Sequence, residues 1–139
     1  MTAGGTAGLS ARVGSEGGIA PEGPPRSVRT VPVTFRNRDG FRLFGILHQP
    51  DRPREPGLGI LLLSPGVKMR VAPHRLYNKM AAGLAALGYP VLRFDFHGLG
   101  DSEGDASETN LADLYRATQQ GRYVPDTLCA ISSVRSQVE

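Results

Sequence analysis

A short stretch of this sequence carries most of the side chains that could do chemistry. Residues 94–104 read FDFHGLGDSEG, and the last five form a G-x-S-x-G pattern around Ser102. Such a pattern can hold a nucleophilic serine when a strand runs directly into it and a helix directly follows. Here the strand should stop near Asp95, and the polar sequence DASETN comes after Gly104. We therefore interpret Ser102 as a loop hydroxyl that hydrogen-bonds to nearby backbone.

The neighbouring residues of this stretch predict a folded loop. A carboxylate at the end of a strand, at Asp95, can accept backbone N–H groups, while Gly98 and Gly100 allow positive φ angles. We predict that these three residues and Ser102 are structural. His97 lies at the carboxyl end of the same strand, where open α/β sheets bind ligands. A substrate-binding role for His97 is one hypothesis, and a histidine that packs within the loop is the other.

Basic residues gather at the start of an expected helix. Lys68, Arg70, His74 and Arg75 lie just before its first turn or within it. Cations at this end oppose the helix dipole unless solvent or an anion compensates them. Arg70 and His74 are therefore candidates for binding an anionic group of a substrate, and a solvated loop is the alternative.

The elements that must position these residues begin with a β-hairpin. Residues 31–37 alternate apolar and polar side chains, the turn sequence RDG follows, and residues 41–50 form the returning strand. Residues 58–64 are a continuous apolar run, which is typical of a strand buried on both faces.

A helix and a second central strand come next. Apolar residues recur at helical spacing over residues 74–88, with Pro73 suited to the first turn and Gly88 to the C-terminal cap. Residues 89–96 form the strand that ends in the glycine-rich loop. Strand, helix and strand in this order predict a parallel pair with a right-handed crossover, and therefore the α/β class.

Two helices should follow the loop, at residues 110–121 and 124–132. Asn110 and Asp126 are suited to their N-caps. We expect the large apolar side chains of these helices to be buried: Leu111, Leu114, Val124, Leu128 and Ile131.

One domain, at residues 31–131, is what this pattern predicts. Residues 1–30 are rich in Gly, Ala and Pro with few large apolar side chains, which favours a disordered tail. Residues 132–139 are expected to be an irregular tail.

Composition argues against several classes of function. The net charge of +3 is scattered along the chain without a basic run, which argues against nucleic-acid binding. No apolar run approaches the roughly 20 residues of a membrane helix, and no secretory signal is recognisable, so a cytoplasmic location is expected. His48, His74 and His97 show no ligand spacing and Cys129 is the only cysteine, so we expect no metal and no cofactor.

These features together resemble the N-terminal part of an α/β-hydrolase. The resemblance is carried by the hairpin, the strand that ends in SPG at residues 64–66, the helix, and the pattern D-x-H-G-x-G-x-S at residues 95–102. The sequence is particularly similar to serine aminopeptidase-like hydrolases and to hydrolases associated with exosortase systems. The resemblance covers residues 31–131 and implies a partial α/β-hydrolase fold.

The resemblance also implies where the oxyanion hole should lie. In such hydrolases a backbone N–H after the first buried strand supplies half of it, which makes Gly66 and Val67 the candidates here. Pro65 stands where the family commonly has histidine. The family's nucleophile, acid and histidine would all follow the portion that this chain matches, and Cys129 lies in an expected helix rather than on a nucleophile turn. The resemblance therefore implies hydrolysis of a small-molecule ester, thioester or amide, and a chain that is inactive alone.

Two readings stay open. The chain is either a hydrolase fragment shortened before its nucleophile, or a non-catalytic binding or subunit module. In both, the sheet has an open edge that invites self-association or a partner chain. A nucleotide-binding protein is set aside, because the sequence after residues 58–64 lacks the G-x-G-x-x-G turn.

Overall fold

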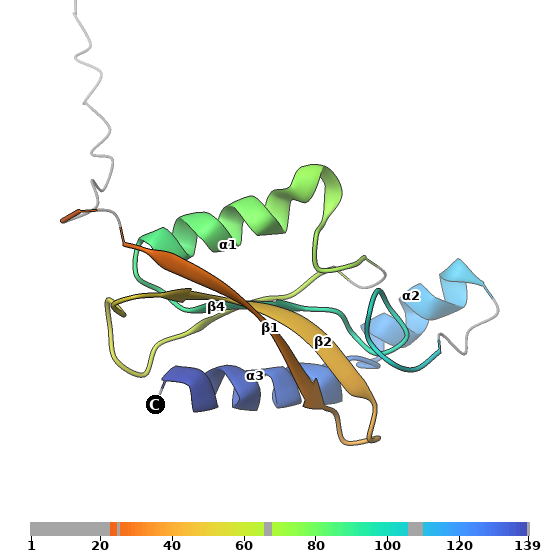
Figure 1. Cartoon of the computed structure of the whole chain (residues 1–139). Coiled ribbons are helices and arrows are strands. Elements are labelled where there is room, and N and C mark those ends of the chain that lie inside the picture. The colour runs from red at the N-terminus through yellow and green to blue at the C-terminus, as the bar shows by residue number, and fades with distance from the viewer. Residues whose placement is uncertain (1–22, 25, 66–67, 106–109, 139) are drawn as a thin grey trace, which may run out of the picture.

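A four-stranded sheet lies at the centre of the part of the chain that the structure describes. The computed structural model describes residues 23–24, 26–65, 68–105 and 110–138. Helix α1 covers one face of the sheet and α3 covers the other (Figure 1). The elements, in chain order, are β1 (Val28–Arg36), β2 (Arg42–Pro50), β3 (Ile60–Leu62), a short 3-10 helix η1 (Pro73–Arg75), α1 (Leu76–Ala86), β4 (Val91–Phe94), α2 (Leu111–Gln119) and α3 (Val124–Val138).

The strands are ordered β1-β2-β4-β3 in the sheet. Strand β2 is antiparallel to both of its neighbours, while β3 and β4 are parallel. The predicted hairpin and the predicted parallel pair with its crossover helix are therefore confirmed. The parallel pair brings the carboxyl ends of β3 and β4 to the same edge of the sheet.

The hairpin turn is held by one asparagine. The Oδ1 of Asn37 accepts the backbone N–H of Asp39 at 3.1 Å and that of Phe41 at 3.0 Å. Gly40 completes the turn with a φ of 86°, which glycine adopts without strain. Strand β1 begins at Val28, inside the range expected to be a tail, and residues 1–22 lie outside the described part.

Strand β3 is shorter and less buried than its sequence predicts. It spans Ile60–Leu62, and all three residues are only partly buried. The continuous apolar run predicted a strand buried on both faces, and this was wrong for the described residues because β3 lies at the edge of the sheet.

Helix α1 begins after an irregular first turn. Ala72, His74 and Arg75 have φ angles of 56–58°, so the regular helix starts only at Leu76. Gly88 ends it as predicted, with a φ of 100° and an N–H that donates to the carbonyl of Ala85 at 2.9 Å.

The α3 side of the sheet holds the larger core. Aromatic rings run from the sheet towards α3, and Phe96 stacks on Tyr123 with 4.3 Å between ring centroids. Burying each such ring contributes about 1.5–3 kcal/mol to folding. The fully or nearly fully buried members of this core are Leu43, Leu47, Leu92, Phe94, Phe96, Tyr123, Ala130 and Val134.

Helix α3 turns a different face inward than the sequence predicts. Its buried residues are Asp126, Ala130 and Val134, whereas the large side chains expected in the core are exposed. The inward face of the helix approaches the chain before β3 closely at Val134, which only a glycine at position 59 allows, because an added Cβ there would lie 2.5 Å from a methyl group of Val134. The exposed side chains that were expected to be buried are Val124, Leu128 and Ile131 on α3 and Leu111 on α2.

Two further expectations for the C-terminal helices have opposite outcomes. Asn110 caps α2, since its Oδ1 accepts the N–H of Asp113 at 3.0 Å. Asp126 is not a cap, because α3 begins at Val124 and Asp126 lies within its first turn. The same helix continues to Val138, so residues 132–138 are helical rather than irregular.

A buried polar pair lies on the α1 side of the sheet. The Nε of Arg93 on β4 donates to Nε2 of His48 on β2 at 3.1 Å, so the ring proton of a neutral His48 is on Nδ1. Burial, and to a lesser extent the charge of Arg93, lower the pKa of His48 below its ordinary value. The folded state therefore favours the neutral imidazole.

This lowered pKa makes stability depend on pH in a defined window. As pH falls through 6.5, the ordinary value for this group, His48 takes up a proton in the unfolded chain but not in the folded one. The free energy of unfolding should therefore decrease from neutral pH until the folded pKa is reached. In the variant His48→Gln, where the amide oxygen can still accept from Arg93, this contribution should be missing.

Urea unfolding at a series of pH values from neutral to mildly acidic measures this difference. All groups other than the side chain of residue 48 are common to both proteins, so their contributions cancel when the two curves are subtracted. Parallel curves for the two proteins would contradict the expected shift.

Candidate functional site

The loop that follows β4 is wrapped around one buried carboxylate. Asp95 is completely buried. Its Oδ1 accepts the backbone N–H of Arg70 at 2.6 Å, and its Oδ2 accepts that of Asp101 at 3.2 Å. Asp95 therefore joins the loop after β4 to the segment that leads from β3 towards α1.

Arg70 strengthens the same junction with its side chain. The guanidinium forms ion pairs with Asp95 and, at 2.6 Å, with Asp101, and it lies over the ring of Phe44 at 4.7 Å. The sequence made Arg70 a candidate for binding an anionic group of a substrate, with a solvated loop as the alternative. Its charge is instead compensated by two carboxylates of the fold, so we do not assign it to a substrate.

Ser102 uses its hydroxyl to hold the loop on the hairpin. Its Oγ donates to the carbonyl of Asp95 at 2.6 Å and accepts the N–H of Phe44, on β2, at 2.9 Å. The single proton of the hydroxyl is therefore bound to a backbone carbonyl. This is the placement that a structural serine requires, and Ser102 does not lie between a strand and a helix.

The glycines of the loop have positive φ angles, which is why glycine is needed there. Gly98 has a φ of 73° and Gly100 one of 55°. At Gly100 a side chain would also meet the Asp95 carboxylate, because an added Cβ would lie 2.5 Å from its Cγ. The loop can close around Asp95 only with a glycine at this point.

His97 is bound to a second buried carboxylate, that of Asp126. The Oδ2 of Asp126 lies 2.8 Å from Nδ1 of His97 and accepts the backbone N–H of His97 at the same distance. Asp126 Oδ1 accepts from the side-chain amide of Asn37 at 2.8 Å. The ring of His97 also lies between Phe41 and Tyr123, with centroids 5.8 and 5.2 Å away. His97 is thus packed into the loop on most sides.

Sequence reasoning missed the roles of Asp126 and Asn37. Asn37 is in the hairpin turn and Asp126 is in α3, and only the folded sheet brings them together. The one signal in the sequence was a carboxylate early in a helix, which also fits an N-cap.

The remaining predicted site residues lie in the loop between β3 and α1. Gly66 and Val67, the oxyanion-hole candidates, are outside the described residues, so their role stays a prediction. The loop ends around them are tied together, because the buried Ser64 donates from Oγ to the carbonyl of Lys68 at 2.6 Å. His74 is exposed, within η1.

The described part of the chain shows no cluster of metal-ligating side chains. No group of three or more His, Cys, Asp or Glu residues could hold a metal ion among the residues that were placed. None of the described helices has the length and apolar character needed to cross a bilayer.

Similarity to solved structures is found at the level of the fold. The chain matches the Pyrococcus furiosus esterase PF2001 with a TM-score of 0.59 and 19% identity, over 78% of this chain and 35% of the esterase. It matches DcsB, solved in complex with its substrate analogue, with a TM-score of 0.55 and 17% identity, over 78% of this chain and 32% of DcsB. The fold is part of the α/β-hydrolase fold.

A third match has the same extent. The hypothetical protein PA2218 from Pseudomonas aeruginosa aligns with a TM-score of 0.54 and 23% identity, over 77% of this chain and 30% of that protein. The chain thus spans about a third of the length of these structures. No protein-family model matches the sequence, and no curated protein does.

In this fold, the loops after β3 and after β4 lie at the same edge of the sheet. The segments after β3 and after β4 both leave the carboxyl ends of parallel strands, where ligands bind in open α/β sheets. The four strands and the β4 loop supply scaffold at this edge. Their described side chains bind one another rather than forming a nucleophile and a base within hydrogen-bonding reach.

Proposed function

We propose that the chain is the N-terminal part of an α/β-hydrolase that cleaves small-molecule esters, thioesters or amides. In this proposal the backbone N–H groups at Gly66 and Val67 form half of the oxyanion hole. The nucleophile, its histidine and the acid are supplied by polypeptide that pairs with the free edge of β3. Alone, the chain is inactive.

The hydrogen bonding of Ser102 is the observation that carries this proposal. An acyl-transfer nucleophile needs a base that takes its proton. The Ser102 hydroxyl instead donates its proton to the carbonyl of Asp95 and accepts the backbone N–H of Phe44. The G-x-S-x-G match is therefore assigned to scaffold, and the attacking group is sought elsewhere.

The surfaces beside β3 support completion by further polypeptide. Among the described strands β3 pairs only with β4, and it presents backbone donors and acceptors at its other edge. Leu58 and Leu63, on either side of β3, are 42% and 45% exposed. On α3, Leu128 and Ile131 are about half exposed in the same way. Apolar side chains concentrated around one strand are typical of an interaction surface.

The narrower likeness to serine aminopeptidase-like and exosortase-associated hydrolases also belongs to the proposal, as does a cytoplasmic location. The narrower likeness comes from the sequence of residues 71–104, and the location is the expectation stated in the sequence analysis. The substrate itself depends on side chains that complete the pocket above the sheet.

Ester hydrolysis and serine labelling test the proposal. The chain alone should hydrolyse p-nitrophenyl acetate no faster than the variant Ser102→Ala does, and a fluorophosphonate probe should not label it. The chain expressed together with the polypeptide encoded directly after it should hydrolyse the ester and be labelled on that second segment. Saturable hydrolysis by the chain alone, lost in Ser102→Ala without loss of folding, would overturn the assignment of Ser102.

A binding or subunit module is the second candidate, and the same free edge of β3 favours it. The two candidates differ in one result. A stable complex that is neither labelled by the probe nor active on p-nitrophenyl acetate and its longer-chain esters and thioesters would contradict the hydrolase and favour the module.

A further inference from the structure

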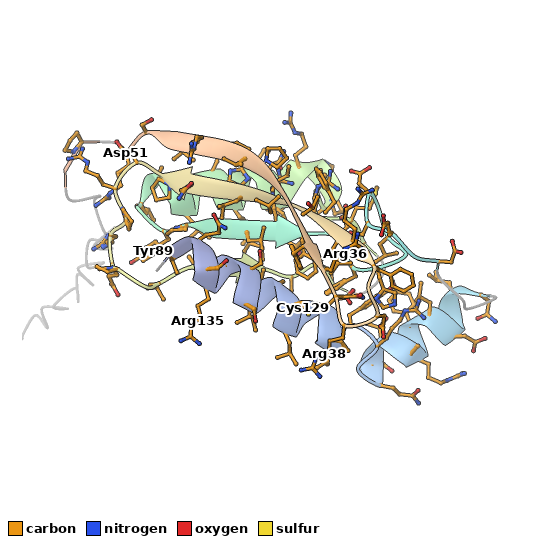
Figure 2. The ribbon with its side chains drawn as sticks, turned by 60° about the horizontal axis from the view of Figure 1, so that its bottom comes forward. Arg36, Arg38, Asp51, Tyr89, Cys129 and Arg135 are labelled. Atoms are coloured by element: carbon orange, nitrogen blue, oxygen red, sulfur yellow. The ribbon has the colours of Figure 1, made fainter. Side chains whose placement is uncertain are left out.

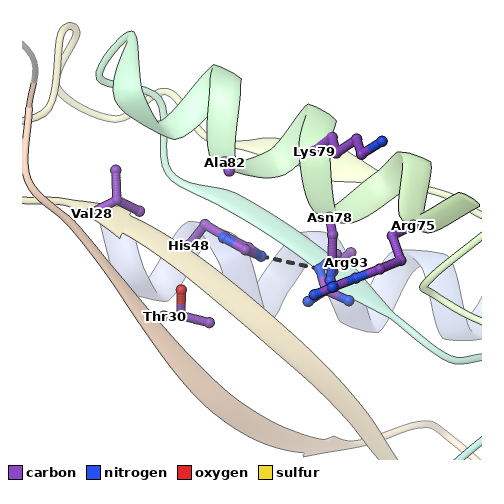
Figure 3. Close-up of a pocket in the computed structure, with 8 residues that line it drawn as sticks. All are labelled: Val28, Thr30, His48, Arg75, Asn78, Lys79, Ala82 and Arg93. Atoms are coloured by element: carbon purple, nitrogen blue, oxygen red, sulfur yellow. Dashed lines mark hydrogen bonds between the residues drawn. The ribbon is translucent and has the colours of Figure 1, made fainter.

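A pocket of about 560 Å³ lies between α1 and the face of the sheet that α1 covers. Strands β1, β2 and β4 form its floor, and the first turns of α1 form its wall (Figure 3). Its volume is in the range of pockets that hold small organic ligands. The polar residues that line it are Thr30, His48, Arg75, Asn78, Lys79 and Arg93.

The floor of the pocket contains a buried guanidinium that has no carboxylate partner in the described part of the chain. Arg93 is only 6% exposed. It donates to the neutral imidazole of His48 at 3.1 Å, and its other described contact is a long one, 3.5 Å, to the carbonyl of Arg70. The neighbouring carboxylate of Asp95 forms its ion pair with Arg70. A buried cation without an ion pair is costly unless an anion joins it.

Two more basic residues line the same pocket. Arg75 directly precedes α1 and Lys79 lies one turn further, and both line the pocket. Figure 3 shows the side chain of Arg75 reaching alongside that of Arg93. Burial and the charges of Arg70 and Arg75 lower the pKa of Arg93, while Asp95 opposes this shift. Like charges at this spacing repel one another, and the first turn of α1 contains no acidic residue to offset them.

The remaining lining indicates what kind of molecule would fit. The amide oxygen of Asn78 is buried without a partner in the described structure, so it is free to accept a hydrogen bond from a hydroxyl or N–H group of a ligand. Val28 and Ala82 give the pocket an apolar part. An oxyanion attached to a short apolar group would match the basic residues and the apolar part of the lining.

We propose that this pocket binds the oxyanion of a small organic acid or phosphate ester. Arg93 is the buried residue that binds the anion, and Arg75 and Lys79 supply further positive charge. The site uses neither Gly66 nor Val67, the proposed oxyanion-hole residues, and does not depend on the proposed hydrolase function. Carboxylate and phosphate share the geometry that a guanidinium binds through two parallel hydrogen bonds.

Calorimetric titration of the chain with hexanoate, hexyl phosphate and inorganic phosphate tests the site. At least one of the two hexyl anions should bind, with hexanol as the neutral control that does not. Whichever headgroup binds more tightly identifies the source of the oxyanion. Inorganic phosphate should bind more weakly than hexyl phosphate because it cannot use the apolar part.

Charge-removing variants decide whether binding takes place in this pocket. Lys79→Gln and Arg75→Gln should each weaken binding about three- to tenfold, and Arg93→Gln by at least about tenfold. Arg38→Gln is the matched control, because Arg38 lies at the hairpin turn (Figure 2) and is not among the residues that line the pocket. It removes the same charge and should leave the affinity unchanged. No binding of either hexyl anion up to roughly 10 mM, or an equal loss in Arg38→Gln, would overturn the proposal.

Discussion

Replacing Gly100 with alanine should lower the free energy of unfolding by about 2–4 kcal/mol. Gly100 has a φ of 55°, where an alanine is strained. An added Cβ would also lie 2.5 Å from Cγ and 3.0 Å from Oδ1 of Asp95. Asp95 cannot move aside, because it is completely buried and bound to the backbone N–H of Arg70 at 2.6 Å. Urea unfolding followed by circular dichroism measures the loss.

Gly40→Ala separates backbone strain from the clash with Asp95. Gly40 also has a positive φ, of 86°, but an added Cβ there would meet nothing within 4 Å. Its replacement should therefore cost only about 1 kcal/mol. Equal losses in the two variants would show that Asp95 does not crowd residue 100, and the described packing of the loop would then be wrong.

The order and type of the elements could be predicted because each has a local cause. Alternation around the RDG turn marked the hairpin, and Gly88 marked the end of α1. Which side chains are buried was harder to predict, because burial depends on neighbours in space. The apolar run at residues 58–64 looks like a central strand, yet its three-residue strand β3 lies at the sheet edge. The leucine and isoleucine of α3 look like core, yet the helix turns Asp126, Ala130 and Val134 inward and leaves both exposed.

In the candidate site, too, contacts within one loop could be predicted from the sequence, and contacts between distant segments could not. A carboxylate at a strand end followed by glycines is a local pattern, and Asp95 does accept the N–H of Asp101 within its own loop. The pairing of Arg70 with Asp95 could not be seen in the sequence, because it joins segments that only the parallel strands bring together. Because the sequence shows no counter-ion for Arg70, its cation looks available to bind a substrate. The pocket around Arg93 was missed for a related reason, since an arginine within an apolar strand gives no local signal of a cavity.

Replacing Asp126 with alanine should cost about 3–5 kcal/mol, the largest loss that we expect from a single side chain. Asp126 is 1% exposed and accepts three hydrogen bonds, each of 2.8 Å. Two come from the backbone and the ring of His97, and one from the amide of Asn37. Its removal leaves these buried donors without an acceptor and disconnects the hairpin turn, the β4 loop and α3 in one step. Thermal and urea unfolding measure the change.

Asp113→Ala is the matched control, because Asp113 holds the same helix position in α2 that Asp126 holds in α3. Asp113 is partly exposed, and its described partners are Asn110 and Arg116 on the surface of its own helix. Its loss should cost at most about 1 kcal/mol, since exposed ion pairs and helix-dipole interactions are weak. The difference between the two variants therefore measures what burial and the bonds to His97 and Asn37 contribute. If both variants lost the same small amount, Asp126 would be acting only as a charge at the start of its helix, and His97 would need another partner to hold it in the loop.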